Sequence, residues 1–418
     1  MKENTLVGPF TQLLPMTGLP LKGALKDSQL PIVENAGILV SEGKIVKTGI
    51  FDDLKTEAGQ IHKIEGKQVC LPGFVDAHTH ICFGGTRARD YALRNSGASY
   101  LEIAKAGGGI WDTVTQTRKA SQSELEKGIK KRAQFHLQNG ITTIEVKSGY
   151  GLSVQEELKM LRAIQNSNRN LEMDLIPTCL AAHIKPKDWQ GNGEYLDEII
   201  SKLFPVLKSE NLANRVDAFV EESAFTTEEV KAYFQEAQNY GFDITVHADQ
   251  FTPGGSEVAI QFKAVSADHL EASTEKEINM LAKSNVIATT LPGASLGLGC
   301  EFTPARKLLD AGGALAIASD HNPGSAPMGD LLTQASILGT FEKLSNTEVL
   351  AGITFRASAA LNLKDRGILA PNFVADFITF PTGNYQEVTY HQGQLKPALV
   401  WKKGELVFER KQYEDKGI

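Results

Sequence analysis

The sequence predicts an α/β protein, a (β/α)8 TIM-type barrel with a small β-sandwich domain built from both chain termini. Three observations predict this class. Eight short apolar segments alternate with helical patterns between about residues 71 and 366. Polar residues follow the ends of most of these segments, where barrels of this kind carry their chemistry. Both ends of the chain instead hold short strand-like runs separated by turn residues.

The two ends of the chain are predicted to fold together. Residues 37–40 and 44–48 flank the turn Ser41-Glu42-Gly43 and form a hairpin pattern, and residues 375–380 and 398–401 repeat this texture. Neither end alone has enough residues for a secure core. The expected division is therefore a composite β-sandwich domain of residues 1–70 and 367–418, and a barrel of residues 71–366.

The barrel strands are expected at 74–78, 142–146, 175–182, 217–220, 244–247, 264–268, 286–290 and 315–319. A helix is expected over 123–139, because Leu125, Ile129 and Ala133 recur every four residues and Gly140 can end it in a left-handed conformation. Residues 226–229 are expected to open another helix, with hydroxyls to cap it. A doubly wound open sheet is the alternative to the barrel.

Composition favours a cytoplasmic protein that binds neither nucleic acid nor a membrane. The net charge is −7, so no basic field favours nucleic acid or an anionic membrane as a partner. The four cysteines contain no C-x-x-C pair, which fits a reducing compartment. The first residues lack the pattern of a signal peptide, and no apolar stretch approaches the ~20 residues that span a bilayer.

A metal site is predicted at the barrel mouth. His78 and His80 lie two residues apart after the first strand, so on extended backbone their imidazoles point to the same side. A third histidine and a carboxylate would complete a site for one zinc or iron(II) ion with room for water. Other strand ends supply His247 and Asp320. The alternative is that the H-x-H pair is incidental.

The run Leu71-Pro72-Gly73-Phe74-Val75-Asp76-Ala77-His78-Thr79-His80 resembles the first-strand signature of the amidohydrolase superfamily. Residues 84–87 (GGTR), 147–152 (KSGYGL) and 322–325 (NPGS) are more specific and resemble the imidazolonepropionase family. The resemblance implies one divalent metal ion, Zn or Fe, on His78, His80, His247 and Asp320. It also implies hydrolysis of the cyclic amide of 4-imidazolone-5-propanoate to N-formimidoyl-L-glutamate in histidine degradation, by a homodimer.

The resemblance also assigns roles. Asp320 is expected to accept the proton of the attacking water, and His269 to assist as a proton donor or electrophile. Arg87 is expected to clamp the propionate, with Arg89 and Arg94 as alternatives. The other expected substrate contacts are Tyr150, His183, Gln250, Asn322, Gly324 and Ser325. Without the resemblance, the last three residues could belong simply to a turn.

Two positions leave alternatives open. Some family members carry a glutamate where this chain has Gln250, and an amide cannot act as a general base. Proton transfer is therefore expected to fall to Asp320 and His269. Lys147 could bridge two metals, as carboxylated lysines do in binuclear relatives, or could form a salt bridge. The rival functions are another amidase or aminohydrolase of the same fold, and a barrel that only binds.

Overall fold

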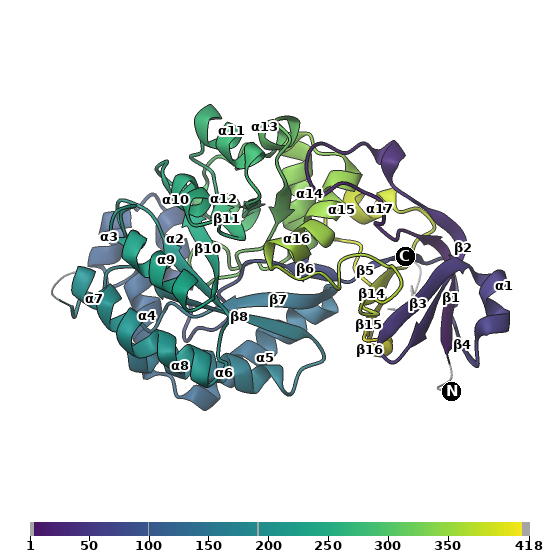
Figure 1. The fold of residues 1–418 in the computed structure, drawn as a ribbon, viewed down its shortest axis with the longest axis horizontal. Helices are drawn as coiled ribbons and strands as arrows, with labels where there is room; N and C mark the ends of the chain where they lie inside the picture. The colour runs from purple at the N-terminus through teal and green to yellow at the C-terminus, as the bar shows by residue number, and fades with distance from the viewer. Residues whose placement is uncertain (1–3, 99, 190–191, 412–418) are drawn as a thin grey trace.

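The computed structural model describes residues 4–98, 100–189 and 192–411. The first three and last seven residues of the predicted composite domain therefore lie outside the described residues. Eight parallel strands form the barrel in chain order: β6 (Phe74–Asp76), β7 (Ile141–Lys147), β8 (Asp174–Ala182), β9 (Arg215–Phe219), β10 (Asp243–Ala248), β11 (Ser266–His269), β12 (Ile287–Thr290) and β13 (Leu315–Ile317). The predicted barrel is confirmed (Figure 1).

The first and last barrel strands, β6 and β13, meet through the residues that directly follow them. The amide of His80 donates to the carbonyl of His321 at 3.0 Å, and the amide of Asp320 donates to the carbonyl of His78 at 3.0 Å. These bonds hold the segment of His78 and His80 beside the segment of Asp320 and His321, although the two are far apart in the sequence. Barrel closure therefore creates the candidate site.

Helices cover the outside of the barrel, and several short ones build its rim. They are α2 (Ala88–Asn95), α3 (Tyr100–Lys105), α4 (Ile110–Lys119), α5 (Gln122–Gln138), α6 (Val154–Asn168), α7 (Asn192–Glu198), η3 (Ile199–Leu203), α8 (Phe204–Ser209), α9 (Val230–Asn239), α10 (Gly255–Gln261), α11 (Glu275–Lys283), α12 (Pro292–Leu298), α13 (Ala305–Asp310), α14 (Leu331–Glu342), α15 (Asn346–Gly352) and α16 (Phe355–Ala360). None of the described helices combines the length and apolarity that crossing a bilayer requires.

Two helix predictions can be compared directly with the structure. Helix α5 begins one residue earlier than expected, behind a capping box formed by Ser121 and Glu124, and Gly140 follows it with a φ of +87°. Helix α9 begins only at Val230. Thr226 and Glu229 bond each other in the turn that precedes it, so the expected hydroxyl cap forms one turn before the helix.

Both chain ends together form a second sheet, called the terminal sheet below, which lies beside the barrel in Figure 1. Its strands are β1 (Thr5–Leu13), β2 (Val33–Ser41), β3 (Lys44–Ile50), β4 (Gln60–Lys63), β5 (Val69–Pro72), β14 (Phe377–Phe380), β15 (Leu399–Lys402) and β16 (Glu405–Glu409). Short elements accompany it: η1 (Asp27–Gln29), α1 (Phe51–Leu54), η2 (Lys55–Glu57) and α17 (Gln386–Tyr390). Strand β14 pairs with β5, which joins the two ends as predicted; the exact domain boundaries stay a prediction.

Gly73 connects the two sheets. It separates β5, in the terminal sheet, from β6, in the barrel. A Cβ atom at this position would lie 2.4 Å from the hydroxyl oxygen of Thr142 on the neighbouring barrel strand. A side chain would therefore push β6 away from β7, and with it the segment that carries His78 and His80.

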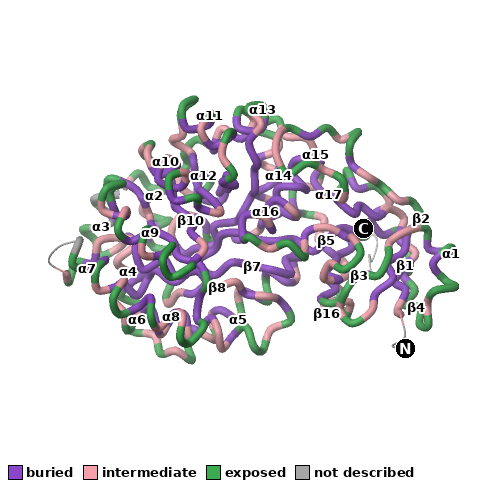
Figure 2. The backbone as a smooth tube through the Cα atoms, in the orientation of Figure 1, coloured by how far each residue is buried: buried purple, intermediate pink, exposed green. Residues whose placement is uncertain are grey.

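Burial follows this architecture (Figure 2). The barrel strands are buried along almost their whole length, as expected for a parallel sheet covered by helices. Buried side chains of the terminal sheet form a separate apolar cluster. In this cluster the ring of Trp401 stacks on Phe377, with centroids 4.8 Å apart.

We expect Trp401→Ala to lower the free energy of unfolding by roughly 3–5 kcal/mol, because it empties a fully enclosed indole site that both chain ends line. Leu406→Ala on the paired strand is the control. Its side chain is 37% exposed, so a change within about 1 kcal/mol is expected. Urea unfolding measures both values, and equal effects would argue against a shared core.

Candidate metal centre and active site

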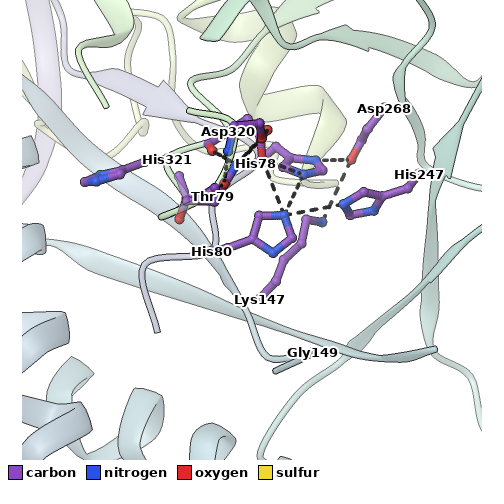
Figure 3. A network of polar contacts seen from close by, with 12 residues as sticks. His78, Thr79, His80, Lys147, Gly149, His247, Asp268, Asp320 and His321 are labelled. Atoms are coloured by element: carbon purple, nitrogen blue, oxygen red, sulfur yellow. Dashed lines mark hydrogen bonds and ion pairs between the residues drawn. The ribbon is translucent and has the colours of Figure 1, made fainter. Parts of the chain in front are cut away.

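Four candidate ligand atoms converge at the carboxyl ends of the barrel strands (Figure 3). His78 Nε2 lies 3.2 Å from His80 Nε2, and His247 Nε2 lies 3.4 Å from the same atom. Asp320 Oδ1 lies 3.6 Å from His78 Nε2 and 3.4 Å from His80 Nε2. All four side chains are almost completely buried. The structure thus brings together the whole predicted ligand set.

This donor set fits a single ion. Bonds of about 2.0–2.1 Å in a tetrahedral arrangement place neighbouring ligand atoms about 3.3 Å apart, which matches the observed spacings. Asp320 Oδ1 is buried and has no hydrogen-bond partner among the described residues. An oxygen in that state is costly unless a cation or proton satisfies it. Imidazole nitrogens with one carboxylate suit zinc or iron(II).

Carboxylates orient two of the histidines. His78 Nδ1 lies 2.7 Å from Asp268 Oδ2, and His247 Nδ1 lies 2.9 Å from Asp217 Oδ2. Each contact engages Nδ1, so Nε2 of each ring faces the common centre. Neither aspartate was predicted in this role. Their strand positions were visible, but only the register between strands shows which histidine each one meets.

Asp320 is fixed in an uncommon backbone conformation. Its φ is +51°, and Asn322 Nδ2 donates to Asp320 Oδ2 at 2.9 Å. This bond engages one carboxylate oxygen and leaves Oδ1 toward the histidines. Burial raises the pKa of Asp320 to about 6, against the opposing effects of His269 and Asn322. Positive φ in a residue other than glycine often marks a functional position.

A cavity of about 610 Å³ opens beside the four ligand atoms. The predicted residues that line it are His80, Arg87, His183, His247, Gln250, His269, Asp320, Asn322, Gly324 and Ser325. Its apolar walls include Ile103, Ile110, Phe219 and Leu298. The size and the few polar groups suit a small polar ligand.

The structure separates the three candidate arginines. Arg87 lines the cavity, and its Nε donates to Asp90. Arg94 also lines it, but its guanidinium donates to the carbonyls of Gly297 and Gly324. Arg89 lies outside the lining and donates to Ala106. Arg87 is therefore the arginine best placed to meet a carboxylate. Asp90, which orients it, is a residue that sequence reasoning missed.

Gly324 leaves room for the Arg87 side chain. A Cβ atom on Gly324 would lie 2.9 Å from Arg87 Nη1 and 3.3 Å from Asn322 Oδ1. The amides of Gly324 and Ser325 both donate to Asn322 Oδ1, at 2.7 and 2.8 Å. The loop after β13 is thus a compact turn centred on Asn322, and it borders the cavity.

His183 and Tyr150 occupy different positions. His183 lines the cavity, and its Nδ1 lies 3.0 Å from the carbonyl of Gly149. A carbonyl can only accept, so Nδ1 carries the proton and Nε2 is free to accept. Burial lowers the pKa of His183 to about 3, which keeps the ring neutral. Tyr150 lies behind, with its ring 5.9 Å from that of His80, and is not part of the cavity lining.

His269 lies beside the ligand cluster on strained backbone. Its φ is +85° and that of Leu270 is +71°, so the chain turns sharply at the end of β11. The turn brings Glu271 Oε1 to 3.4 Å from His269 Nδ1. The imidazole therefore has a carboxylate on one side and the cavity on the other. Glu271 is another residue that sequence reasoning missed.

His321 points away from the candidate metal centre (Figure 3). Its Nδ1 lies 2.8 Å from His136 Nε2, so the two histidines form a buried pair outside the ligand cluster. A carboxylated Lys147 is not favoured either, because its Nζ lies 2.8 Å from carboxylate oxygens of both Glu145 and Asp217.

Comparisons with known proteins place this geometry in a family. The amidohydrolase family model matches residues 69–407. The imidazolonepropionase of Bacillus cytotoxicus is 39% identical, and that of Bacillus mycoides 38%, each over 97% of this chain and 97% of the relative.

Solved structures with the same fold are more distant in sequence. A triazine hydrolase variant superimposes with a TM-score of 0.74 at 16% identity, covering 97% of this chain and 95% of the other. The atrazine chlorohydrolase of Arthrobacter aurescens TC1, complexed with zinc, gives 0.70 at 16% identity, covering 98% and 95%. Identity at this level speaks for the fold alone, whereas the near full-length relatives decide the family. The chain belongs to the imidazolonepropionase family of the amidohydrolases.

Proposed function

We propose that the chain hydrolyses the cyclic amide of 4-imidazolone-5-propanoate to N-formimidoyl-L-glutamate, with one zinc or iron(II) ion held by His78, His80, His247 and Asp320. The observation that carries the proposal is that the ligand atoms of His78, His247 and Asp320 all lie within 3.2–3.4 Å of His80 Nε2, at the wall of a cavity that Arg87 also lines. Membership of the family supplies the substrate.

The ion, when bound, supplies Lewis acidity that brings the pKa of a coordinated water toward ~7. Asp320 is the base beside that position. Asn322 holds one of its oxygens and leaves the carboxylate aimed at the cavity, so it can take the proton of the water that attacks the ring carbonyl carbon. Gln250 lines the cavity but cannot perform this step, and it serves as a substrate contact.

Ring opening needs a proton at the departing nitrogen. Water adds to the ring carbonyl carbon, the bond from that carbon to the ring nitrogen breaks, and the carbon becomes the new carboxylate of the product. His269 can deliver the proton, because Glu271 engages its Nδ1 and leaves the other ring nitrogen toward the cavity.

The remaining side chains orient the substrate. Arg87 pairs with the propionate, since a planar guanidinium matches a carboxylate with two parallel hydrogen bonds. His183 accepts a hydrogen bond from the ring N–H through its free Nε2. Asn322, Gly324 and Ser325 border the site of the new carboxylate. Tyr150 acts from behind, by packing against His80 and His183.

The cellular compartment and the oligomeric state of the enzyme are also proposals. All four cysteines are free thiols, which fits a reducing cytoplasm. A homodimer is expected from the family resemblance, and sedimentation of the purified chain would test it.

Turnover of the imidazolone tests the proposed function. The substrate absorbs in the ultraviolet, so its loss can be followed directly, and mass spectrometry identifies the ring-opened product. The proposal expects N-formimidoyl-L-glutamate as the product of the metal-loaded protein. Hydrolysis of dihydroorotate, or release of ammonia from a heterocycle, with no action on the imidazolone would overturn it.

We expect Arg87→Met to raise KM about 10–100-fold, because the substrate carboxylate loses its charged partner at a cost of about 1.5–3 kcal/mol. The change in kcat should be smaller. Arg89→Met is the matched control: that arginine is close in the chain but outside the cavity, so KM should stay at the wild-type value. Steady-state kinetics measures both values, and an unchanged KM in Arg87→Met would show that Arg87 does not bind the propionate.

A further inference from the structure

Lys147 is a buried cation that the proposed reaction does not use. Its side chain is fully buried at the end of β7, directly below the ligand cluster (Figure 3). Its Nζ lies 2.8 Å from Asp217 Oδ2, 2.8 Å from Glu145 Oε2 and 3.9 Å from Asp268 Oδ2. One ammonium group therefore meets three carboxylates from three different barrel strands.

Two of these carboxylates are the ones that orient the metal-binding histidines. The oxygen of Asp217 that contacts Lys147 is also the oxygen 2.9 Å from His247 Nδ1. The oxygen of Asp268 nearest to Lys147 is also the oxygen 2.7 Å from His78 Nδ1. Lys147 thus stands one residue behind two of the three histidine ligands at once.

The charges explain why a lysine is needed there. Three buried carboxylates inside the barrel repel one another, and burying them unpaired would cost several kcal/mol each. Burial alone would lower the pKa of Lys147, but Asp217, Glu145 and Asp268 together raise it above its ordinary value. The side chain is therefore held as an ammonium, which donates to Glu145 and Asp217 and lies within ion-pair distance of Asp268.

We propose that Lys147 is a positioning residue of the metal centre: its ammonium anchors Asp217 and Asp268, and through them it aims Nε2 of His247 and of His78 at the common centre. The inference rests on the proposed function only in assuming that an ion binds there. Carboxylates behind metal-bound histidines typically change metal affinity by about 10–100-fold when altered, and Lys147 holds two of them together.

Lys402 provides a matched control. It is also buried, at 5% exposure, and its Nζ contacts two carboxylates, Asp174 at 2.8 Å and Asp376 at 2.5 Å. It belongs to β15 in the terminal sheet and has no contact with the metal ligands among the described residues. Replacing either lysine by methionine removes one buried ammonium from a carboxylate cluster.

The test measures zinc affinity of the full-length protein by competition with a chromophoric chelator, alongside circular dichroism and turnover. Lys147→Met is expected to raise the zinc Kd about 10–100-fold and to change the visible spectrum of the cobalt(II)-loaded protein. Lys402→Met is expected to lose stability but to keep a zinc Kd within about twofold of wild type. A wild-type zinc Kd in folded Lys147→Met would overturn the proposal.

Two further variants keep the proposal testable if Lys147→Met alone does not fold. Lys147→Met combined with Glu145→Gln removes one charge of each sign, and it should weaken zinc binding in the same way. In an Asp268→Asn background, the added effect of Lys147→Met should be smaller than in wild type, because the two residues act through one contact. Full additivity would contradict the proposal. Wild-type protein that binds zinc without turnover would sink the proposed function and leave this inference standing.

Discussion

Asp320→Asn is expected to lower kcat about 10³-fold, with the protein still folded and still able to bind an ion. The asparagine keeps the shape and one carbonyl-type oxygen for the metal centre. It loses the capacity to take a proton from the attacking water. Three histidines remain, so metal content should fall less than activity does. Stopped-flow absorbance and elemental analysis on the same sample separate the two effects.

The adjacent residue offers a control for Asp320. His321→Gln alters the next position in the chain, but that ring faces His136 and not the cavity. It should lower stability and change kcat by only a few fold. Asp320→Asn protein with near wild-type kcat would assign the proton transfer to another group.

The second large effect is expected for His269→Asn, which should lower kcat about 10²–10⁴-fold. Departure of the ring nitrogen without a proton donor would leave an unstabilised anion. KM should change little, because the substrate carboxylate is held by Arg87. Metal content should stay at the wild-type level, since His269 is not one of the four proposed ligands.

Glu271→Gln separates positioning from proton transfer. The amide can still accept a hydrogen bond from His269 Nδ1, so the ring orientation is retained while the negative charge is lost. We expect a smaller loss of kcat than in His269→Asn, again at unchanged metal content. If His269→Asn lost its metal in step with its activity, the ring would be a ligand and the assignment of proton donor would be wrong.

Much of the fold could be predicted, because the barrel repeats one simple pattern. Each apolar run between about residues 74 and 319 became a strand, with ends shifted by one to a few residues. Strand β1 was not predicted, since its run contains Gly8, Pro9 and three polar residues that blur the alternation. Pairing of β5 with β14 requires contacts between residues about 300 positions apart, which local patterns cannot specify.

The predicted site shows a similar limit. Barrels of this kind carry their chemistry at the carboxyl ends of the strands, and this rule placed His78, His247 and Asp320 at one mouth of the barrel without any knowledge of distances. It could not choose among the three arginines between residues 87 and 94, because that choice depends on how the loop packs at Gly324. Nor could it show that Tyr150 lies behind His80. A tyrosine that follows a barrel strand can line the cavity or pack behind it, and the sequence is the same in both cases.

The groups that orient the ligands were the hardest to predict. Asp217 sits inside a barrel strand among apolar neighbours, and only the pairing of β9 with β10 brings it to His247. Asp90 meets Arg87 from the first turn of α2, and Glu271 meets His269 across the sharp turn after β11. Each is a partner of a predicted residue, so a search for a carboxylate near every expected histidine or arginine would have flagged them as candidates.

Stepwise zinc titration of the metal-free protein, with imidazolone turnover measured at each step, tests the central claim most directly. One ion on His78, His80, His247 and Asp320 predicts activity that rises linearly and stops at one equivalent per chain. Activity that keeps rising to two equivalents, or full zinc binding with no loss of imidazolone absorbance, would contradict a one-ion imidazolone hydrolase.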